Sequence, residues 1–179
     1  MATTKGQRSA MPDTKPTDLV LLHFSTSKSE AISAFPTRGT RHPFPLAQLM
    51  RQVVSDRLFL AGEQLRAGDH LLLGGQHRSA ISRHYYAMYQ AARAIVFAET
   101  RGDDYERHNI LPRNLPPTLE DSATREAELT NARLLRNQAD YDVYPLSDSD
   151  WETDARALAA TAVNFLQICE TFASTNGHI

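Results

Sequence analysis

The chain has 179 residues, 41% of them hydrophobic, and a formal net charge of −2, which allows one domain and excludes the strongly basic domains that wrap nucleic acid. The single cysteine, Cys169, excludes an intramolecular disulfide, and its place on an apolar helical stripe predicts a buried, inert thiol. No run approaches the ~18 consecutive apolar residues of a membrane span, and the N-terminus lacks a signal-peptide apolar region, so we expect a cytoplasmic protein that does not enter a membrane.

Residues 1–45 are predicted to form a flexible, poorly ordered N-terminal arm. They are rich in Thr, Ser, Lys and Pro, and their prolines interrupt any helix or central strand. One apolar island, residues 18–24, suits a short strand or a segment that docks on a surface. Because the arm offers little periodic apolar surface to bury, we expect it to be dispensable for folding.

Apolar residues at helical spacing predict a first long helix over residues 46–73. Gly74 and Gly75 then form a natural helix stop. Two glycines inside this helix, Gly62 and Gly68, each weaken it by up to ~1 kcal/mol relative to alanine. We therefore expect them where the helix packs closely against a neighbour.

A second helix is predicted over residues 76–100, with one apolar face and one polar face. The apolar face repeats at steps of four and three residues and comprises Ile81, Tyr85, Met88, Ala92 and Ile95. The opposite face comprises Arg83, Tyr86, Gln90 and Arg93. These four side chains are too polar for a core, but they hydrogen-bond or stack.

Two further long helices follow a region with room for one short helix. A capping-box pattern at residues 118–121 predicts the start of the third long helix, which runs to about Tyr141. Its inward stripe comprises Ala132, Leu135, Ala139 and Val143. A second capping-box pattern, Ser149 with Glu152, predicts the start of the last helix, whose apolar stripe runs from Trp151 to Phe172.

These elements predict an all-α fold, an antiparallel up-and-down bundle of four long helices plus a short one, over residues 46–175. Two motifs are placed in this bundle: Ser-Arg-x-Tyr-Tyr-Ala at residues 82–87, and Leu-Arg-x-x-Ala-Asp-Tyr at residues 135–141. In this order, after a helix that ends in leucines and glycines, they resemble the HEPN domain (higher eukaryotes and prokaryotes nucleotide-binding) of the prokaryotic stand-alone type. The resemblance covers residues 48–172 and implies a HEPN-like bundle.

Many HEPN-like proteins are metal-independent ribonucleases, in which an arginine holds the scissile phosphate and a histidine a few residues later moves a proton. Arg136 matches the arginine, but Tyr141 stands near the position of the histidine. A tyrosine with an ordinary pKa near ~10 is a poor general base at neutral pH. His84 and His108 are the other candidates to approach Arg136, and each is alternatively a surface or border histidine.

The candidate nucleotide- or RNA-binding residues are Arg136, Asp140, Tyr141, Arg83 and Tyr86. Arg136 suits a phosphate or a base, or alternatively an ion pair with Asp140 one helical turn away. Tyr86 suits stacking on an unpaired base, or alternatively packing between helices. No histidine has a carboxylate or cysteine at metal-ligand spacing, so we expect no metal, and we expect no cofactor.

The resemblance implies a nucleotide- or RNA-associated protein. HEPN-like proteins of this type are often encoded beside a minimal nucleotidyltransferase, so we expect a partner subunit of such an enzyme in a toxin–antitoxin or defence-type system. The alternatives are an active metal-independent ribonuclease toxin with a displaced histidine, and a non-catalytic dimeric scaffold. A homodimer is expected, because helices that carry Arg136 would otherwise form only half a groove.

Overall fold

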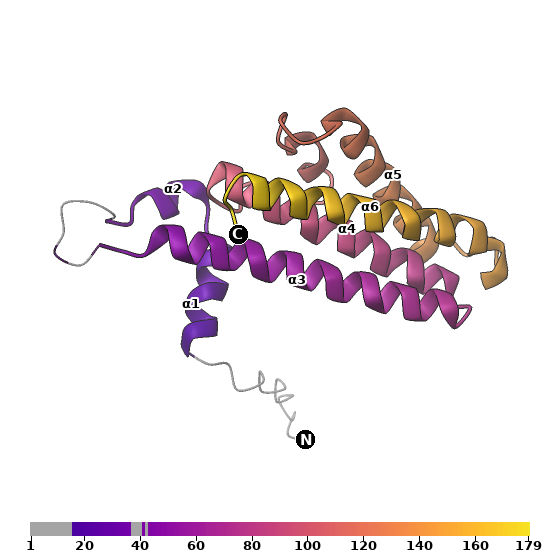
Figure 1. The fold of residues 1–179 in the computed structure, drawn as a ribbon. Helices are drawn as coiled ribbons and strands as arrows, with labels where there is room; N and C mark the ends of the chain where they lie inside the picture. The colour runs from indigo at the N-terminus through magenta and orange to yellow at the C-terminus, as the bar shows by residue number, and fades with distance from the viewer. Residues whose placement is uncertain (1–15, 37–40, 42) are drawn as a thin grey trace, which may run out of the picture.

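A computed structural model describes residues 16–36, 41 and 43–179 of the chain. Its helices are α1 (Pro16–Ser25), α2 (Ser29–Ser33), α3 (Leu46–Leu73), α4 (His77–Thr100), α5 (Ser122–Tyr141) and α6 (Glu152–Thr175), with short 3-10 helices η1 (Leu111–Asn114) and η2 (Asp148–Trp151). The described residues contain no strand, which confirms the all-α prediction (Figure 1). None of the described helices is both long and apolar enough to cross a bilayer.

The four long helices form the predicted bundle, with α4 packed against α3, α5 and α6 (Figure 1). The bounds of α3 and α4 agree with the prediction to within one residue. These two helices run antiparallel because the chain reverses over Gly74, Gly75 and Gln76, whose N–H groups donate to the last carbonyls of α3 at 2.9–3.1 Å. Gly75 has a φ of 69°, a conformation that favours glycine.

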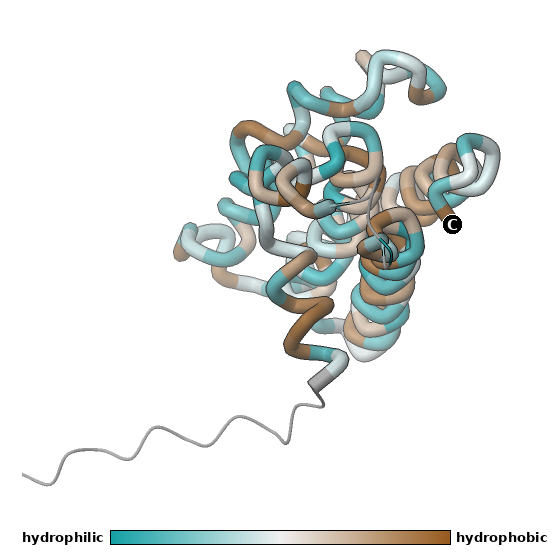
Figure 2. Tube along the Cα trace, turned by 90° about the vertical axis from the view of Figure 1, so that its left-hand side faces the viewer, coloured by the Kyte–Doolittle hydropathy of each residue, from teal (hydrophilic) through white to brown (hydrophobic). Residues whose placement is uncertain are grey.

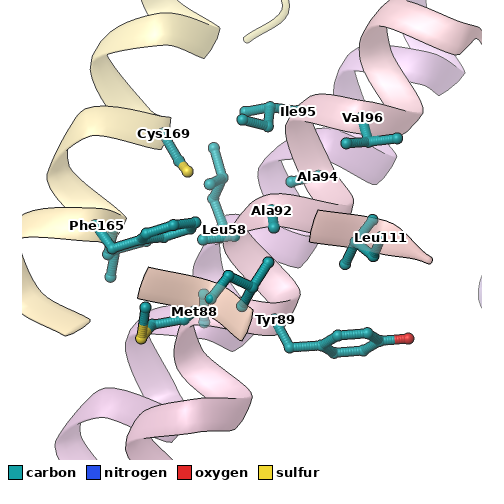
Figure 3. Close-up of a cluster of buried hydrophobic side chains, with 14 of the residues drawn as sticks. Leu58, Met88, Tyr89, Ala92, Ala94, Ile95, Val96, Leu111, Phe165 and Cys169 are labelled. Atoms are coloured by element: carbon teal, nitrogen blue, oxygen red, sulfur yellow. The ribbon is translucent and has the colours of Figure 1, made fainter. Parts of the chain in front are cut away.

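The core lies where α4 meets α3 and α6, and Figure 3 shows Leu58, Met88 and Phe165 converging there from the three helices. Every residue of the apolar face predicted for α4 is buried. The stripe predicted for α6 is also buried, and Cys169 within it has no solvent exposure. Burial raises the pKa of the Cys169 thiol, in agreement with an inert cysteine.

The third and fourth long helices begin in a different way from the prediction. The N–H of Leu119 donates to the Pro116 carbonyl at 3.0 Å, and the N–H of Ser122 donates to the Leu119 carbonyl at 3.1 Å, so residues 116–121 form turns and α5 begins at Ser122. The capping box predicted at residues 118–121 was therefore wrong. The hydroxyl of Ser149 likewise caps no helix, because it hydrogen-bonds Ser147.

The inward stripe predicted for α5 is correct except at its last member. Ala132 and Ala139 are buried, and Leu135 is partly buried against the core. Val143 lies beyond the end of α5 and is 62% exposed, so its predicted place on the buried stripe was wrong. The helix stops before it at Tyr141, where the chain turns to an extended conformation at Asp142.

The described N-terminal residues differ from the prediction of a flexible arm. Residues 16–36 include α1 and α2, and α1 replaces the short strand considered for residues 18–24. Phe24 and Ile32 are buried in the core, with Phe24 edge-on to Phe97 of α4 at 6.1 Å between ring centroids. Figure 2 shows α1 as the brown apolar segment that follows the grey N-terminal trace. Residues 1–15, 37–40 and 42 of the predicted arm lie outside the described residues.

A buried ion cluster joins this N-terminal part to the bundle. Arg57 of α3 and Arg93 of α4 both bind the carboxylate of Asp103, with the Oδ1 atom 3.1 Å from Arg57 Nη2 and 2.8 Å from Arg93 Nε. Arg57 also donates to the Ser25 carbonyl at 2.5 Å, and Lys28 Nζ donates to the Asp103 carbonyl at 2.5 Å. Charged groups that leave water are stable only when paired in this way. The N-terminal helices thus hold the loop that follows α4.

Candidate functional site

Arg136 lies on α5 facing α4, and its guanidinium is held by three neighbours. Its Nε lies 2.7 Å from Oδ2 of Asp140, Nη2 donates to the Tyr86 hydroxyl at 2.9 Å, and Nη1 donates to Oδ1 of Asn137 at 3.1 Å. The predicted ion pair with Asp140 is therefore present. Although burial opposes it, the Asp140 carboxylate raises the pKa of Arg136 above its usual value. An arginine carries five N–H donors, and Tyr86 and Asn137 each accept a hydrogen bond from one of them here.

Two tyrosine rings flank this guanidinium. Its carbon lies 5.4 Å from the centroid of the Tyr86 ring and 5.6 Å from that of the Tyr141 ring, which is cation–π distance. Tyr86 is partly buried against the core between α4 and α5, so its packing role is present. Tyr141, at the end of α5, is 72% exposed and presents most of its ring to solvent. An exposed ring next to a guanidinium is a surface on which a planar base stacks.

An open hollow of about 420 Å³ lies beside Arg136 between α4 and α5. It is lined by Arg78, Ser79, Ser82, Arg83, Tyr86, Ala139 and Asp140. Three predicted binding residues, Arg83, Tyr86 and Asp140, thus share one hollow. Arg83 is exposed and donates to Gln64 of α3 at 3.1 Å, while the Ser82 hydroxyl hydrogen-bonds Asp140.

His108 reaches the same cluster from the loop between α4 and η1. Its Nδ1 lies 2.5 Å from the Tyr85 hydroxyl, and its ring stacks on Tyr89 at 4.1 Å between centroids with a 17° angle between planes. It also meets the edge of Tyr86, whose hydroxyl binds Arg136, at 6.1 Å between centroids. The structure therefore places His108 and Arg136 in contact with one tyrosine. Sequence spacing did not identify this proximity, because the histidine precedes Arg136 and comes from a separate loop.

The pKa of His108 is lowered by partial burial and then by the positive charges of Arg136, Arg133 and Arg93. The imidazole is therefore neutral near pH 7. A neutral imidazole both donates and accepts hydrogen bonds, which is the property that proton transfer near neutral pH needs.

His84, the other candidate histidine, lies elsewhere. It is fully buried, its Nε2 lies 3.0 Å from Oδ1 of Asp69 on α3, and its ring packs against Gly68. Burial lowers the pKa of His84. Among the described residues, no hydrogen bond or ion pair joins it to Arg136, so it serves the α3–α4 contact.

Two residues that the sequence did not single out fix the ends of the site helices. Arg78 of α4 donates from Nε to the Ala139 carbonyl at 2.9 Å and thereby caps the end of α5. Asp148 accepts hydrogen bonds from the N–H groups of His77 at 2.5 Å and Arg78 at 3.2 Å, which caps the start of α4. Asp148 is remote from α4 in sequence, so no local capping pattern marks it.

The described residues contain no group of three or more His, Cys, Asp or Glu side chains arranged to hold a metal ion. In comparisons with known proteins, no family model, curated protein or solved structure matches the chain at a significant level.

Proposed function

We propose that this chain is a HEPN-like protein that binds the phosphate of a nucleotide or of single-stranded RNA at the surface formed by Arg136, Tyr86, Tyr141 and Arg83. The observation that carries the proposal is the guanidinium of Arg136, which Asp140, Tyr86 and Asn137 hold in one orientation beside an open hollow. A pre-oriented guanidinium suits a phosphate, since its planar donors match two phosphate oxygens.

The aromatic neighbours favour a nucleotide over a simple phosphate ion. Tyr141 presents its ring within cation–π distance of the guanidinium, so a base and its phosphate have adjacent places on this surface. The hollow beside Tyr86 is open and lies between two helices, which suits a flexible single strand better than a rigid duplex. The formal net charge of −2 argues for a short contact with few phosphates, because wrapping a duplex needs many basic residues.

Binding of a labelled single-stranded RNA and of adenosine monophosphate, measured by fluorescence anisotropy and calorimetry in the presence of chelator, tests the proposal. Arg136→Ala removes a charge-assisted contact of about 1.5–3 kcal/mol, so affinity should fall about tenfold or more. Arg156→Ala is the matched control, because Arg156 also pairs with an acid one turn away, Glu152, but lies on α6. Equal affinity of the two variants would contradict the proposal.

The same proposal includes the partners that the HEPN resemblance implies. We propose a homodimer that pairs two Arg136 surfaces, and association with a minimal nucleotidyltransferase in a toxin–antitoxin or defence-type system. Light scattering at tens of micromolar tests the first part, and a monomer would contradict it. Co-expression with the product of the neighbouring reading frame, followed by co-purification, tests the second part.

A second candidate function, metal-independent cleavage of RNA, is supported by the position of His108. A neutral imidazole and Arg136 both contact Tyr86, so a cation and a proton-transfer group are present without the usual sequence spacing. RNA cleavage in the presence of chelator by the wild type, lost in His108→Ala and retained in His70→Ala, would favour this function. His70 is a suitable control because it is exposed and its side chain hydrogen-bonds within its own helix, at the Arg66 carbonyl.

A further inference from the structure

His108 is held in place from three directions. The loop that carries it is tied to α4 by the Tyr89 hydroxyl, which donates to the Glu106 carbonyl at 2.5 Å. Lys28 pairs with the Glu106 carboxylate at 2.6 Å from the N-terminal side. The ring itself lies flat against Tyr89 and meets the Tyr85 hydroxyl with Nδ1. These contacts fix the position of an exposed side chain that contributes little to the core, which suggests a role other than packing.

The contact with Tyr85 determines where the imidazole proton lies. Tyr85 is almost completely buried, and burial raises the pKa of its phenol, so the hydroxyl keeps its proton. Its oxygen meets a single hydrogen-bond partner within the described chain, Nδ1 of His108. A buried hydroxyl that stays protonated must donate to that partner, because its hydrogen would otherwise be unpaired. A neutral His108 whose Nδ1 accepts this hydrogen carries its own proton on Nε2.

We propose that His108 donates a hydrogen bond from Nε2–H to a phosphate oxygen of the bound nucleotide or RNA, and that Tyr85 is the positioning residue that fixes this tautomer. Nε2 points away from Tyr85, and no partner among the described residues occupies it. Arg136 and His108 both contact Tyr86, so each can supply a donor to a phosphate bound beside that side chain. This inference rests on the proposed binding function.

The tautomer also limits the chemistry open to His108. A neutral imidazole with its proton on Nε2 donates a hydrogen bond from that atom but gives up a proton only from its imidazolium form, and it cannot accept the proton of an attacking hydroxyl through the same atom. Neutral His108 therefore fits the role of a hydrogen-bond donor, and any cleavage of RNA would need its base from another group.

Nitrogen-15 NMR of the imidazoles in the full chain tests the tautomer directly. We expect the His108 pattern of an Nε2–H tautomer in the wild type, and a mixed tautomer in Tyr85→Phe, which keeps the ring and loses the hydroxyl. Tyr105→Phe is the control, because this partly buried tyrosine hydroxyl makes no hydrogen bond among the described residues. An Nδ1–H tautomer in the wild type, or an unchanged pattern in Tyr85→Phe, would overturn the proposal.

Binding of the same single-stranded RNA and adenosine monophosphate tests the donor role. The Nε2 resonance of His108 should shift on addition of either probe, and His108→Ala should weaken binding about tenfold, the effect of one hydrogen bond to a charged group. Weaker binding in Arg136→Ala together with full affinity in His108→Ala would overturn the donor role and leave the binding function intact. Absence of any binding by the wild type would refute both.

Discussion

Asp103→Asn tests whether the buried ion cluster holds the N-terminal helices and the loop of His108 on the bundle. The Asp103 side chain is only 4% exposed and is the carboxylate shared by Arg57 and Arg93. Asparagine has nearly the same shape but no charge, so the variant leaves two buried guanidiniums facing each other. Removing one partner of a buried ion pair costs about 3–5 kcal/mol. The free energy of unfolding of a domain is about 5–15 kcal/mol, so a large share would be lost.

Urea denaturation followed by circular dichroism measures this loss. Asp104→Asn is the matched control. The Asp104 carboxylate accepts a hydrogen bond from the N–H of Ser29 at 3.1 Å, and asparagine keeps an oxygen that can accept it. We expect Asp104→Asn to stay within about 1 kcal/mol of the wild type. If Asp103→Asn unfolds with the same free energy as this control, the cluster does not stabilise the fold as argued.

The same cluster predicts a dependence of stability on pH. Burial opposes ionisation of Asp103, but Arg93 and Arg57 outweigh it and hold the pKa of the carboxyl below its usual 3.8. A group whose pKa is lower in the folded state contributes stability above its unfolded pKa, and this contribution is lost as the pH falls through the folded pKa. The wild type should therefore lose its advantage over Asp103→Asn below about pH 4, as measured by urea midpoints across the acid range.

Three further predictions concern packing, the N-terminal helices and chemistry. Gly62→Ala should raise the free energy of unfolding by up to about 1 kcal/mol, because alanine favours the helix. Gly68→Ala should lower it by about 1–3 kcal/mol, because an added Cβ at Gly68 would lie 2.6 Å from the ring of His84. Equal urea midpoints of the two variants would contradict this. Deleting residues 1–36 should lower the thermal midpoint by several degrees because it removes the buried side chains of Phe24 and Ile32, and deletion of residues 1–15 is the control. An unchanged midpoint would support the prediction that the arm is dispensable for folding. Tyr141→His should raise cleavage of single-stranded RNA in chelator, since it brings an imidazole next to the guanidinium on α5, and unchanged cleavage would count against that role.

The long helices were predictable because their apolar residues repeat at helical spacing and bury a single face. Ile81, Met88 and Phe165 occupy the core positions that this spacing assigns to them. The start of α5 was not predictable from a capping pattern, because hydrogen bonds within residues 116–121 compete with the helix for the same N–H groups. Packing decided between these two local alternatives, since Leu119 is buried in the turn.

Helices α1 and α2 were not predicted from the sequence, for a different reason. Among the described residues of these helices, Phe24 and Ile32 are the fully buried apolar side chains, which is too few for a periodic pattern. Further contacts of this segment are hydrogen bonds with Asp103 and Asp104, which are remote in sequence and involve backbone groups. Gly102 permits this approach, since a Cβ there would overlap the backbone of Ser29. The sequence alone marks none of these long-range contacts.

The two parts of the candidate site, Arg136 and His108, are therefore held in place by different parts of the chain. Arg136 and Asp140 lie one turn apart on α5, so the bundle alone maintains their pair with Tyr86. His108 lies on a loop that α4 holds through Tyr85 and Tyr89, and Lys28 holds the same loop from the N-terminal side, at the Asp103 carbonyl and at the Glu106 carboxylate. A chain without the N-terminal helices should therefore keep the guanidinium in place and hold the imidazole less firmly, through α4 alone. Binding by Arg136 and hydrogen-bond donation by His108 are separable in this fold, because they depend on different parts of the chain.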